Sequence, residues 1–243
     1  MEPVGRHFKI ETLGAVDGPG LRFVLFLQGC PLRCPYCHNP ESWAMAGGEA
    51  ITVPQVLARV ERYRSFYRDG GLTVSGGEPL VQAEFVVALL ARCREAGIHT
   101  ALDTSGVVLS PMAKQAVLAA DLLLLDIKAA DPALHQSAFG APLSAAMETL
   151  QWRQTAGLPV WIRHVVAPGL TDSPAQIRQL AELLAPFSCV ERVELLPFRR
   201  LCTEKYESLG IPFPIGERGE PSDREMASHR AILSERLPNC GIL

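Results

Sequence analysis

The sequence predicts an α/β fold built on a parallel sheet. Short apolar runs typical of strands alternate six times with stretches typical of helices, and this alternation indicates parallel strands joined by crossover helices. The chain has 243 residues, of which 48 % are hydrophobic, so it can build a sizeable core. We therefore expect one domain spanning residues 1–243.

The predicted strands are short, and the first, Phe-Val-Leu-Phe-Leu at 23–27, is apolar throughout. Uninterrupted apolar runs of this length are typical of strands that are buried on both faces. The other strands are expected at 72–75, 99–102, 121–127, 159–166 and 190–196.

The predicted helices combine apolar residues at helical spacing with residues that favour helix ends. Serine or threonine caps the first turn, proline suits the first helical position, and glycine follows the last turn. Residues 199–220 are polar and rich in glycine and proline, so we expect a loop or lid there. The helices are expected over 52–67 with Thr52 as cap, over 82–96 before Gly97, from Ser110-Pro111, from a cap at Ser144 to Gly157, from Ser173-Pro174, and from Ser222 with Glu225 in a capping box to a stop before Pro238.

Composition excludes several classes of protein. The net charge of −3 gives no basic footprint for nucleic acid, and no apolar run approaches the roughly 18 residues that span a membrane. Seven cysteines without an apolar export signal indicate reduced thiols in the cytoplasm. Four of them are scattered, and we expect small buried or partly buried thiols there: Cys93, Cys189, Cys202 and Cys240.

The other three cysteines, Cys30, Cys34 and Cys37, lie on one short loop after the first predicted strand. Three thiolates this close in the chain can reach one metal centre. Iron–sulfur clusters are held by cysteine thiolates, and a four-iron cluster normally takes four of them. Three ligands leave one iron open to a small molecule.

Three other interpretations of this loop are open. Cys34 to His38 matches the pattern of c-type haem attachment, but that pattern leaves Cys30 unexplained. A structural zinc site on the three cysteines and His38 lacks the usual second pair of ligands, and Cys37 and His38 are adjacent. The thiols can also have no shared role.

Further segments place chemically useful residues at the carboxyl ends of predicted strands, where loops converge on one mouth in this architecture. Paired glycines allow a close approach of the backbone. Neighbouring aspartates repel each other unless a cation or a base lies between them. A guanidinium in an apolar strand needs a partner for its charge. Taken singly, each segment is also explained by a turn, a solvated loop or a surface lysine. The segments are Ser75-Gly76-Gly77-Glu78, Asp103-Thr104, Asp126-Ile127-Lys128, and Arg163 within 160–166.

Together these motifs resemble the radical SAM enzymes, and within them the family that activates glycyl radical enzymes, the pyruvate formate-lyase activases in particular. The resemblance implies a partial (β/α)6 barrel with a C-terminal helix, forming a single radical SAM core domain. It implies a [4Fe-4S] cluster whose open iron binds S-adenosylmethionine, which is cleaved to a 5′-deoxyadenosyl radical. The resembling segments include 17–22, 28–30, 36–39, 75–78, 102–106, 125–128, 161–163 and 194–197.

The resemblance also assigns residues to bound groups. The expected cluster ligands are Cys30, Cys34 and Cys37, and together with Lys128 they form the expected catalytic set. A monovalent cation beside the cofactor carboxylate is implied on Asp103, Thr104, the Leu124 carbonyl and Asp126. The residues expected to contact S-adenosylmethionine are Tyr36, Cys37, His38, Gly76, Gly77, Glu78, Asp126, Ile127, Lys128, Arg163 and Arg199.

Arg199 is a departure from the family, which usually has a histidine there that contacts the cofactor. The chain reads Phe198-Arg199-Arg200 after Pro197. Arginine is longer than histidine, permanently charged, and donates in a planar fork. We expect Arg199 to point into the mouth of the barrel, since neighbouring side chains alternate along an extended segment.

The expected function is anaerobic activation of pyruvate formate-lyase by removal of a hydrogen atom from a backbone glycine, with reduced flavodoxin or ferredoxin as electron donor. The protein is expected to be a cytoplasmic monomer. Alternatives are activation of another glycyl radical enzyme, a small-molecule radical enzyme such as 7-carboxy-7-deazaguanine synthase, or an iron–sulfur electron carrier.

Overall fold

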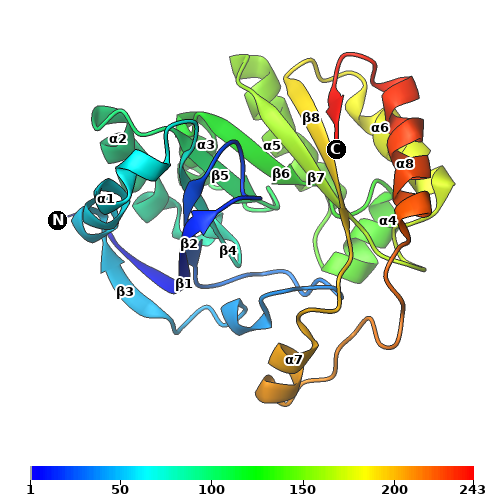
Figure 1. Cartoon of the computed structure of the whole chain (residues 1–243), viewed down its shortest axis with the longest axis horizontal. Helices are drawn as coiled ribbons and strands as arrows, with labels where there is room; N and C mark the ends of the chain where they lie inside the picture. Colours follow the sequence, from blue (N-terminus) through cyan, green and yellow to red (C-terminus); the bar gives the residue numbers. More distant parts are fainter. Residues whose placement is uncertain (1) are drawn as a thin grey trace. The chain divides into compact units, whose positions relative to one another are not determined.

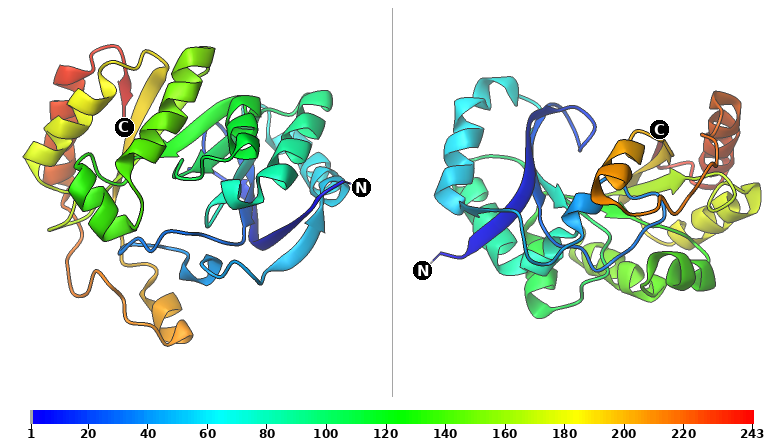
Figure 2. Two further views of the ribbon diagram at one scale, coloured as in Figure 1. Left: turned by 180° about the vertical axis from the view of Figure 1, so that it is seen from behind. Right: turned by 90° about the horizontal axis from the view of Figure 1, so that it is seen from below.

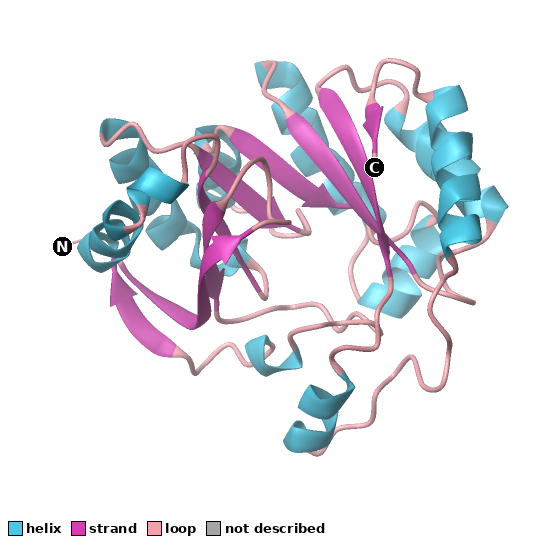
Figure 3. Cartoon of the chain, in the orientation of Figure 1, coloured by secondary structure: helices cyan, strands magenta, loops and turns pink. Residues whose placement is uncertain are grey.

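The computed structural model describes residues 2–243, which fall into two compact units. The first unit comprises the chain up to Pro31 together with Ser42–Leu124, and the second comprises Leu32–Glu41 and Leu125–Leu243. Both units combine helices with strands, so the predicted α/β class is confirmed (Figures 1 and 3). No helix in the described part of the chain has the length and apolar character needed to cross a membrane.

The sheet of the first unit has the strand order β3-β1-β2-β4-β5 and is open, with β3 at its edge. Strand β2 is buried along its whole length and pairs in parallel with β4, with Leu25 opposite Val74 and Leu27 opposite Gly76. Strand β4 pairs in parallel with β5. The strands are β1 (Val4–Gly14), β2 (Arg22–Leu27), β3 (Glu49–Thr52), β4 (Gly71–Gly76) and β5 (Thr100–Thr104).

The helices of the first unit begin where the capping residues predicted them. Thr52 accepts from the Gln55 amide and Ser110 from the Ala113 amide, each with proline in the first turn. The first helix ends sooner than predicted, because the chain tightens into a 3₁₀ turn at Arg64–Phe66. The helices are α1 (Val53–Arg62), α2 (Ala83–Glu95) and α3 (Pro111–Ala119), and Pro79–Gln82 forms a further 3₁₀ turn, η3.

The second unit contains the parallel strands β7, β8 and β9, in that order, and β6 runs across the boundary between the units. Two of its helices, α6 and α8, start at capping boxes formed by Ser173 with Gln176 and by Ser222 with Glu225, as the sequence predicted for Ser222. The elements are β6 (Leu122–Asp126), α4 (Pro132–Leu134), the π-helical turn η4 (His135–Phe139), α5 (Leu143–Ala156), β7 (Val160–Val166), α6 (Pro174–Leu184), β8 (Val190–Pro197), α7 (Thr203–Leu209), α8 (Asp223–Arg236) and β9 (Gly241–Ile242).

Several elements differ from the prediction. Strands β1, β3 and β9 were not predicted, and β1 pairs antiparallel with β2 and β3. Helix α7 lies inside 199–220, where only a loop was expected. The cap of α5 is Pro142 rather than Ser144, which lies within the first turn. The two glycine stops are confirmed, since Gly97 and Gly157 both have positive φ values near 63° and 64°.

Candidate functional site

The cysteine loop begins directly after β2. Cys30 belongs to the first unit, whereas Cys34 and Cys37 lie on Leu32–Glu41 of the second. Cys30 and Cys34 are buried and Cys37 is half-buried. The Cys37 amide donates to the Cys34 carbonyl oxygen at 3.1 Å, which closes a turn between the last two thiols. None of the three cysteines forms a disulfide within the described chain.

The other four cysteines are also free thiols. Cys93, Cys189 and Cys202 are buried and Cys240 is half-buried, as the sequence predicted. Burial raises the pKa of Cys93 to about 12, so that thiol stays protonated at neutral pH. These cysteines are therefore typical small buried side chains.

A charged cluster surrounds Cys34 in the second unit. Burial raises the pKa of Cys34 to about 11, while the positive charge of Lys128 acts in the opposite direction. Lys128 itself donates to Asp126 Oδ2 at 2.6 Å. Burial lowers the pKa of Lys128, but the negative charges around it outweigh burial and hold that pKa well above its usual value. Lys128 is therefore a fixed cation close to a thiol that must lose its proton to bind metal.

Tyr36 lies between the second and third cysteines and is almost completely buried. Its ring packs on Phe139 of η4, with the ring centroids 5.5 Å apart. Its hydroxyl has no hydrogen-bond partner within residues 2–243. A buried hydroxyl without a partner is costly, so this position fits a site that is completed by a bound molecule.

The glycine pair at the end of β4 lies against the start of the cysteine loop. The Glu78 amide donates to the Gly29 carbonyl oxygen at 2.8 Å, and the Gly77 amide donates to that of Leu27 at 2.9 Å. A Cβ atom at Gly77 would lie 2.4 Å from the Gly29 oxygen and 2.9 Å from the Cys30 Cβ atom. Glycine is therefore required here by the close approach of two backbones.

Glu78 holds this segment through its carboxylate, which is fully buried. It accepts from the Leu80 amide at 3.0 Å, the Thr104 hydroxyl at 2.6 Å and the Ser105 amide at 2.9 Å, and also from the Ser105 hydroxyl. Burial raises the pKa of Glu78, and these hydrogen bonds partly oppose that rise. The carboxylate thus ties the end of β4 to the end of β5, a role that the sequence alone did not reveal.

The aspartates predicted at strand ends have protein partners. Asp103 Oδ2 accepts from the Ser75 hydroxyl at 2.7 Å, and Asp126 pairs with Lys128. The Thr104 hydroxyl is occupied by Glu78, and Leu124 is buried within β6. For Asp126, the ammonium of Lys128 supplies the positive charge that the sequence argument required.

Arg163 has the partner that was predicted for a guanidinium on an apolar strand. It lies opposite Glu194 in the pairing of β7 with β8, and its Nε atom is 3.5 Å from Glu194 Oε2. Both side chains are nearly buried. Ile127, between Asp126 and Lys128, has its carbonyl oxygen bound by His164 Nδ1 at 2.7 Å, so the backbone of this segment is fixed.

Arg199 contributes its backbone rather than its side chain to the cysteine loop. His38 Nε2 donates to the Arg199 carbonyl oxygen at 2.9 Å. The guanidinium pairs with Glu220 Oε2 at 2.6 Å and its side chain is 44 % exposed. This ion pair does not support the inward orientation that we expected for Arg199, because the fork is already bound at the surface. Its contact with the cofactor stays a prediction.

Helix α7 also holds the cysteine loop, a contact that was not predicted from the sequence. Lys205 donates to the His38 carbonyl and to the Asn39 side chain, and Tyr206 donates to the Cys37 carbonyl. Figure 2 shows α7, in orange, beside this part of the blue loop. The only signal was the pair Lys205-Tyr206 within a short polar stretch, which is not distinctive.

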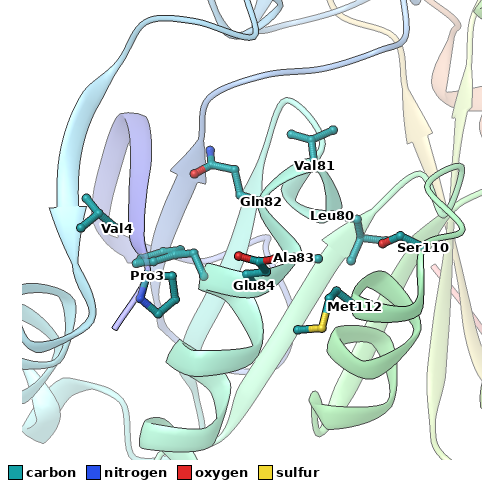
Figure 4. A pocket seen from close by; sticks show the side chains of 10 residues that line it. Pro3, Val4, Leu80, Val81, Gln82, Ala83, Glu84, Ser110 and Met112 are labelled. Carbon is teal, nitrogen blue, oxygen red and sulfur yellow. The ribbon is translucent and has the colours of Figure 1, made fainter. Parts of the chain in front are cut away.

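No three side chains of cysteine, histidine, aspartate or glutamate within the described residues converge on a point suited to a single metal ion. In a four-iron cluster each cysteine binds its own iron, so the thiols need not converge on one point. A separate hollow of about 410 Å³ lies at the start of α2 (Figure 4). None of the predicted site residues lines it; Pro3, Gln82 and Met112 are among those that do.

The family model of the radical SAM superfamily matches residues 24–183, which include the whole cysteine loop. The chain belongs to the radical SAM superfamily. Membership implies a [4Fe-4S] cluster and S-adenosylmethionine as the bound groups. The interpretations as a haem protein or a zinc protein are thereby replaced.

Within this superfamily the chain is similar to pyruvate formate-lyase-activating enzymes over almost its whole length. It is 42 % identical to that of Clostridium pasteurianum, covering 91 % of this chain and 93 % of the relative. It is 36 % identical to the pyruvate formate-lyase 1-activating enzyme of Escherichia coli K12, covering 97 % of each chain. The family predicted from the sequence motifs is therefore confirmed.

Solved structures agree on the fold. A domain of the pyruvate-formate lyase-activating enzyme from Bacteroides vulgatus superposes with a TM-score of 0.59 at 26 % identity, covering 72 % of this chain and 98 % of that one. A radical SAM methyltransferase from Sphaerobacter thermophilus gives a TM-score of 0.67 at 20 % identity, covering 91 % of this chain and 65 % of that one. The predicted partial barrel of the radical SAM type is confirmed.

Proposed function

We propose that this chain activates pyruvate formate-lyase by removing a hydrogen atom from a backbone glycine of that enzyme. The observation that carries the proposal is the similarity to pyruvate formate-lyase-activating enzymes of 34–42 % identity over more than nine-tenths of the chain. When bound, the cluster and S-adenosylmethionine supply a one-electron cleavage of the sulfonium that yields the 5′-deoxyadenosyl radical. The protein positions the reacting groups and excludes water.

The residues present fit the cluster. Three cysteines outside any disulfide of the described chain, Cys30, Cys34 and Cys37, are separated by three and two residues. The loop therefore offers three soft ligands within reach of one cluster. Burial disfavours the Cys34 thiolate, and the nearby Lys128 ammonium favours it. The protein therefore offers a cation that helps to offset the negative charge of the thiolates.

The residues around these cysteines also fit S-adenosylmethionine. In the proposal, the peptide groups of Gly76 and Gly77 bind its amino group. The missing Cβ atoms let this segment pack directly against the backbone of Leu27 and Gly29, which holds it beside the cysteine loop. Lys128 binds the carboxylate or a ribose hydroxyl. Tyr36 and His38 pack on the adenine, and the buried Tyr36 hydroxyl supports such a site. The resemblance places three more residues at this site: Glu78, Ile127 and Arg163. In the proposal they either contact the cofactor or hold the backbone of the residues that do.

The monovalent cation belongs to the same proposal and rests on the resemblance. Its ligands would be Asp103, Thr104, the Leu124 carbonyl and Asp126. The Thr104 hydroxyl donates to Glu78 and accepts from the Gly106 amide, which leaves one lone pair of this oxygen for a cation. The Lys128 ammonium at Asp126 supplies a competing positive charge. The electron donor would be reduced flavodoxin or ferredoxin, and the working form a cytoplasmic monomer.

The experiment combines anaerobically reconstituted protein with S-adenosylmethionine, a reductant and pyruvate formate-lyase. We expect 5′-deoxyadenosine, methionine and a glycyl radical detected by electron paramagnetic resonance. Replacing Cys30, Cys34 or Cys37 by Ala should abolish all three signals, whereas Cys93→Ala and Cys240→Ala serve as controls that retain them. An active Cys34→Ala protein would refute the cluster assignment.

The alternatives predict different outcomes in the same assay. A glycyl radical that forms only on a different partner enzyme would show another activase. Deoxyadenosine formation that no protein partner accelerates would point to a small-molecule enzyme. Iron and sulfide without deoxyadenosine would leave an electron carrier.

A further inference from the structure

The exit of the cysteine loop, from Cys37 to Glu41, is held by the short helix α7. Lys205 Nζ lies 2.8 Å from the His38 carbonyl oxygen, 2.9 Å from Asn39 Oδ1 and 2.7 Å from Glu41 Oε1. One ammonium has three donors, and here each has an acceptor on the loop. A single side chain of α7 thus binds three of the four residues that follow Cys37.

Tyr206, the next residue of α7, reaches the third cysteine itself. Its hydroxyl donates to the Cys37 carbonyl oxygen at 3.1 Å. The side chain is almost fully buried, and its ring packs on Phe213 with centroids 4.7 Å apart. Because the ring is fixed by this packing, the hydroxyl is presented to Cys37 in a defined place.

The segment before α7 adds a third contact in the same direction. His38 donates to the Arg199 carbonyl, and its ring lies 6.4 Å from that of Phe198. Every residue from Cys37 to Asn39 is therefore tied to the stretch 198–206.

We propose that Lys205 and Tyr206 are positioning residues for Cys37 and thereby determine how firmly the cluster is retained. This inference rests on the proposed function, since it assumes that Cys37 binds iron. With the Cys37 carbonyl fixed by Tyr206, only the side-chain torsion of Cys37 still moves its sulfur. With the exit fixed by Lys205, the turn between Cys34 and Cys37 cannot unwind toward Glu41.

The first test uses cluster-free protein, so that it does not depend on the reaction. Lys205→Met keeps the length of the side chain and removes its donors, and Tyr206→Phe removes only the hydroxyl. Hydrogen–deuterium exchange of peptides covering 34–41 should become roughly tenfold faster in Lys205→Met, as expected for the loss of charge-assisted hydrogen bonds at a partly exposed site. Tyr206→Phe should give a smaller rise.

The second test uses reconstituted protein and follows the release of iron to a ferrous chelator. Both variants should release iron several-fold faster than the parent while their thermal midpoints stay close to it. Lys205→Arg should restore most of the retention, because a guanidinium can still donate to several acceptors. On the loop, Asn39→Ala removes one acceptor of Lys205, and Glu41→Ala removes another. These two variants decide the question if a helix variant fails to fold.

Matched controls lose similar contacts elsewhere. Lys9→Met breaks an exposed ion pair with Glu11, and Tyr67→Phe removes a hydroxyl that donates to the Thr12 carbonyl. Neither should change exchange in 34–41 or the release of iron. Parental rates in both Lys205→Met and Tyr206→Phe would overturn the inference. A parent protein that takes up no cluster would overturn the proposed function instead, while the exchange experiment would still decide the role of α7.

Discussion

Replacing Glu78 by Gln tests whether this carboxylate is a structural tie between β4 and β5. The fully buried side chain accepts from the Leu80 amide, the Thr104 hydroxyl and both the amide and hydroxyl of Ser105. Glutamine keeps its size but has one acceptor oxygen in place of two. The Ser105 amide then faces an NH₂ group and loses its acceptor.

The expected loss follows from these contacts. An unsatisfied buried donor costs about 1–3 kcal/mol, and the remaining bonds change from charge-assisted to neutral at about 0.5–1 kcal/mol each. Glutamine carries no charge, so the substitution also removes the cost of burying the Glu78 carboxylate, a cost that raises the pKa of Glu78. This gain offsets part of the loss of stability. We expect Glu78→Gln to lower the free energy of unfolding by about 2–4 kcal/mol, or about 4–16 °C in the thermal midpoint at this chain length.

The assay is urea unfolding of the cluster-free, reduced protein, followed by circular dichroism. Glu84→Gln, an exposed change in the first turn of α2, is the control and should stay within about 0.5 kcal/mol of the parent. Thr104→Val should lose part of the same energy, and the double variant should be less than additive. A Glu78→Gln protein as stable as the parent would refute the structural role and favour a direct contact with the cofactor.

Three further predictions concern charged and titratable side chains. Asp126→Asn removes the partner of Lys128 and should weaken cofactor binding and change its dependence on potassium or sodium; anaerobic titrations with identical affinities in all salts would exclude the cation site. Arg199→Ala should raise the cofactor Kd less than twofold, because its side chain is bound to Glu220; a several-fold rise would restore the contact predicted from the sequence. Burial lowers the pKa of all six histidines, so the unfolded chain binds more protons, and the free energy of unfolding should fall as the pH drops below about 6.5. Urea titrations at about pH 7.5 and about pH 5.5 measure this slope, which His164→Gln should reduce; an unchanged free energy would contradict it.

The elements that were predicted correctly are specified by residues that lie close together in the sequence. Ser110 and Ser222 form caps with residues three positions later, so a few letters of sequence specify the helix start. Strand β2 was recognised because residues 23–27, which make up all of it except Arg22, are uniformly apolar. Strand β1 was missed because it mixes buried and exposed residues without strict alternation, and its register shifts against β2 near His7 and Glu11.

The candidate site likewise has a part that could be predicted from the sequence and a part that could not. The cysteine spacing and the glycine pair are contiguous in sequence, so they were visible in the chain alone. The partners of Glu78 come from the next strand, and Lys205 comes from a seven-residue helix whose N-cap, Cys202, has no side-chain capping bond. Such contacts depend on the folded path of the chain, and a single sequence has no local pattern for them.

The contact between α7 and the cysteine loop has a consequence for the order of events during protein synthesis. Asn39 and Lys205 are 166 residues apart. At about 5–20 residues per second, roughly 8–33 s separate the emergence of the two segments from the ribosome. During that interval the nascent chain displays its cysteines without the helix that binds the loop. Metal that arrives after release of the finished polypeptide would bind a loop that α7 already holds. Metal that arrives earlier would bind a loop that α7 does not yet hold.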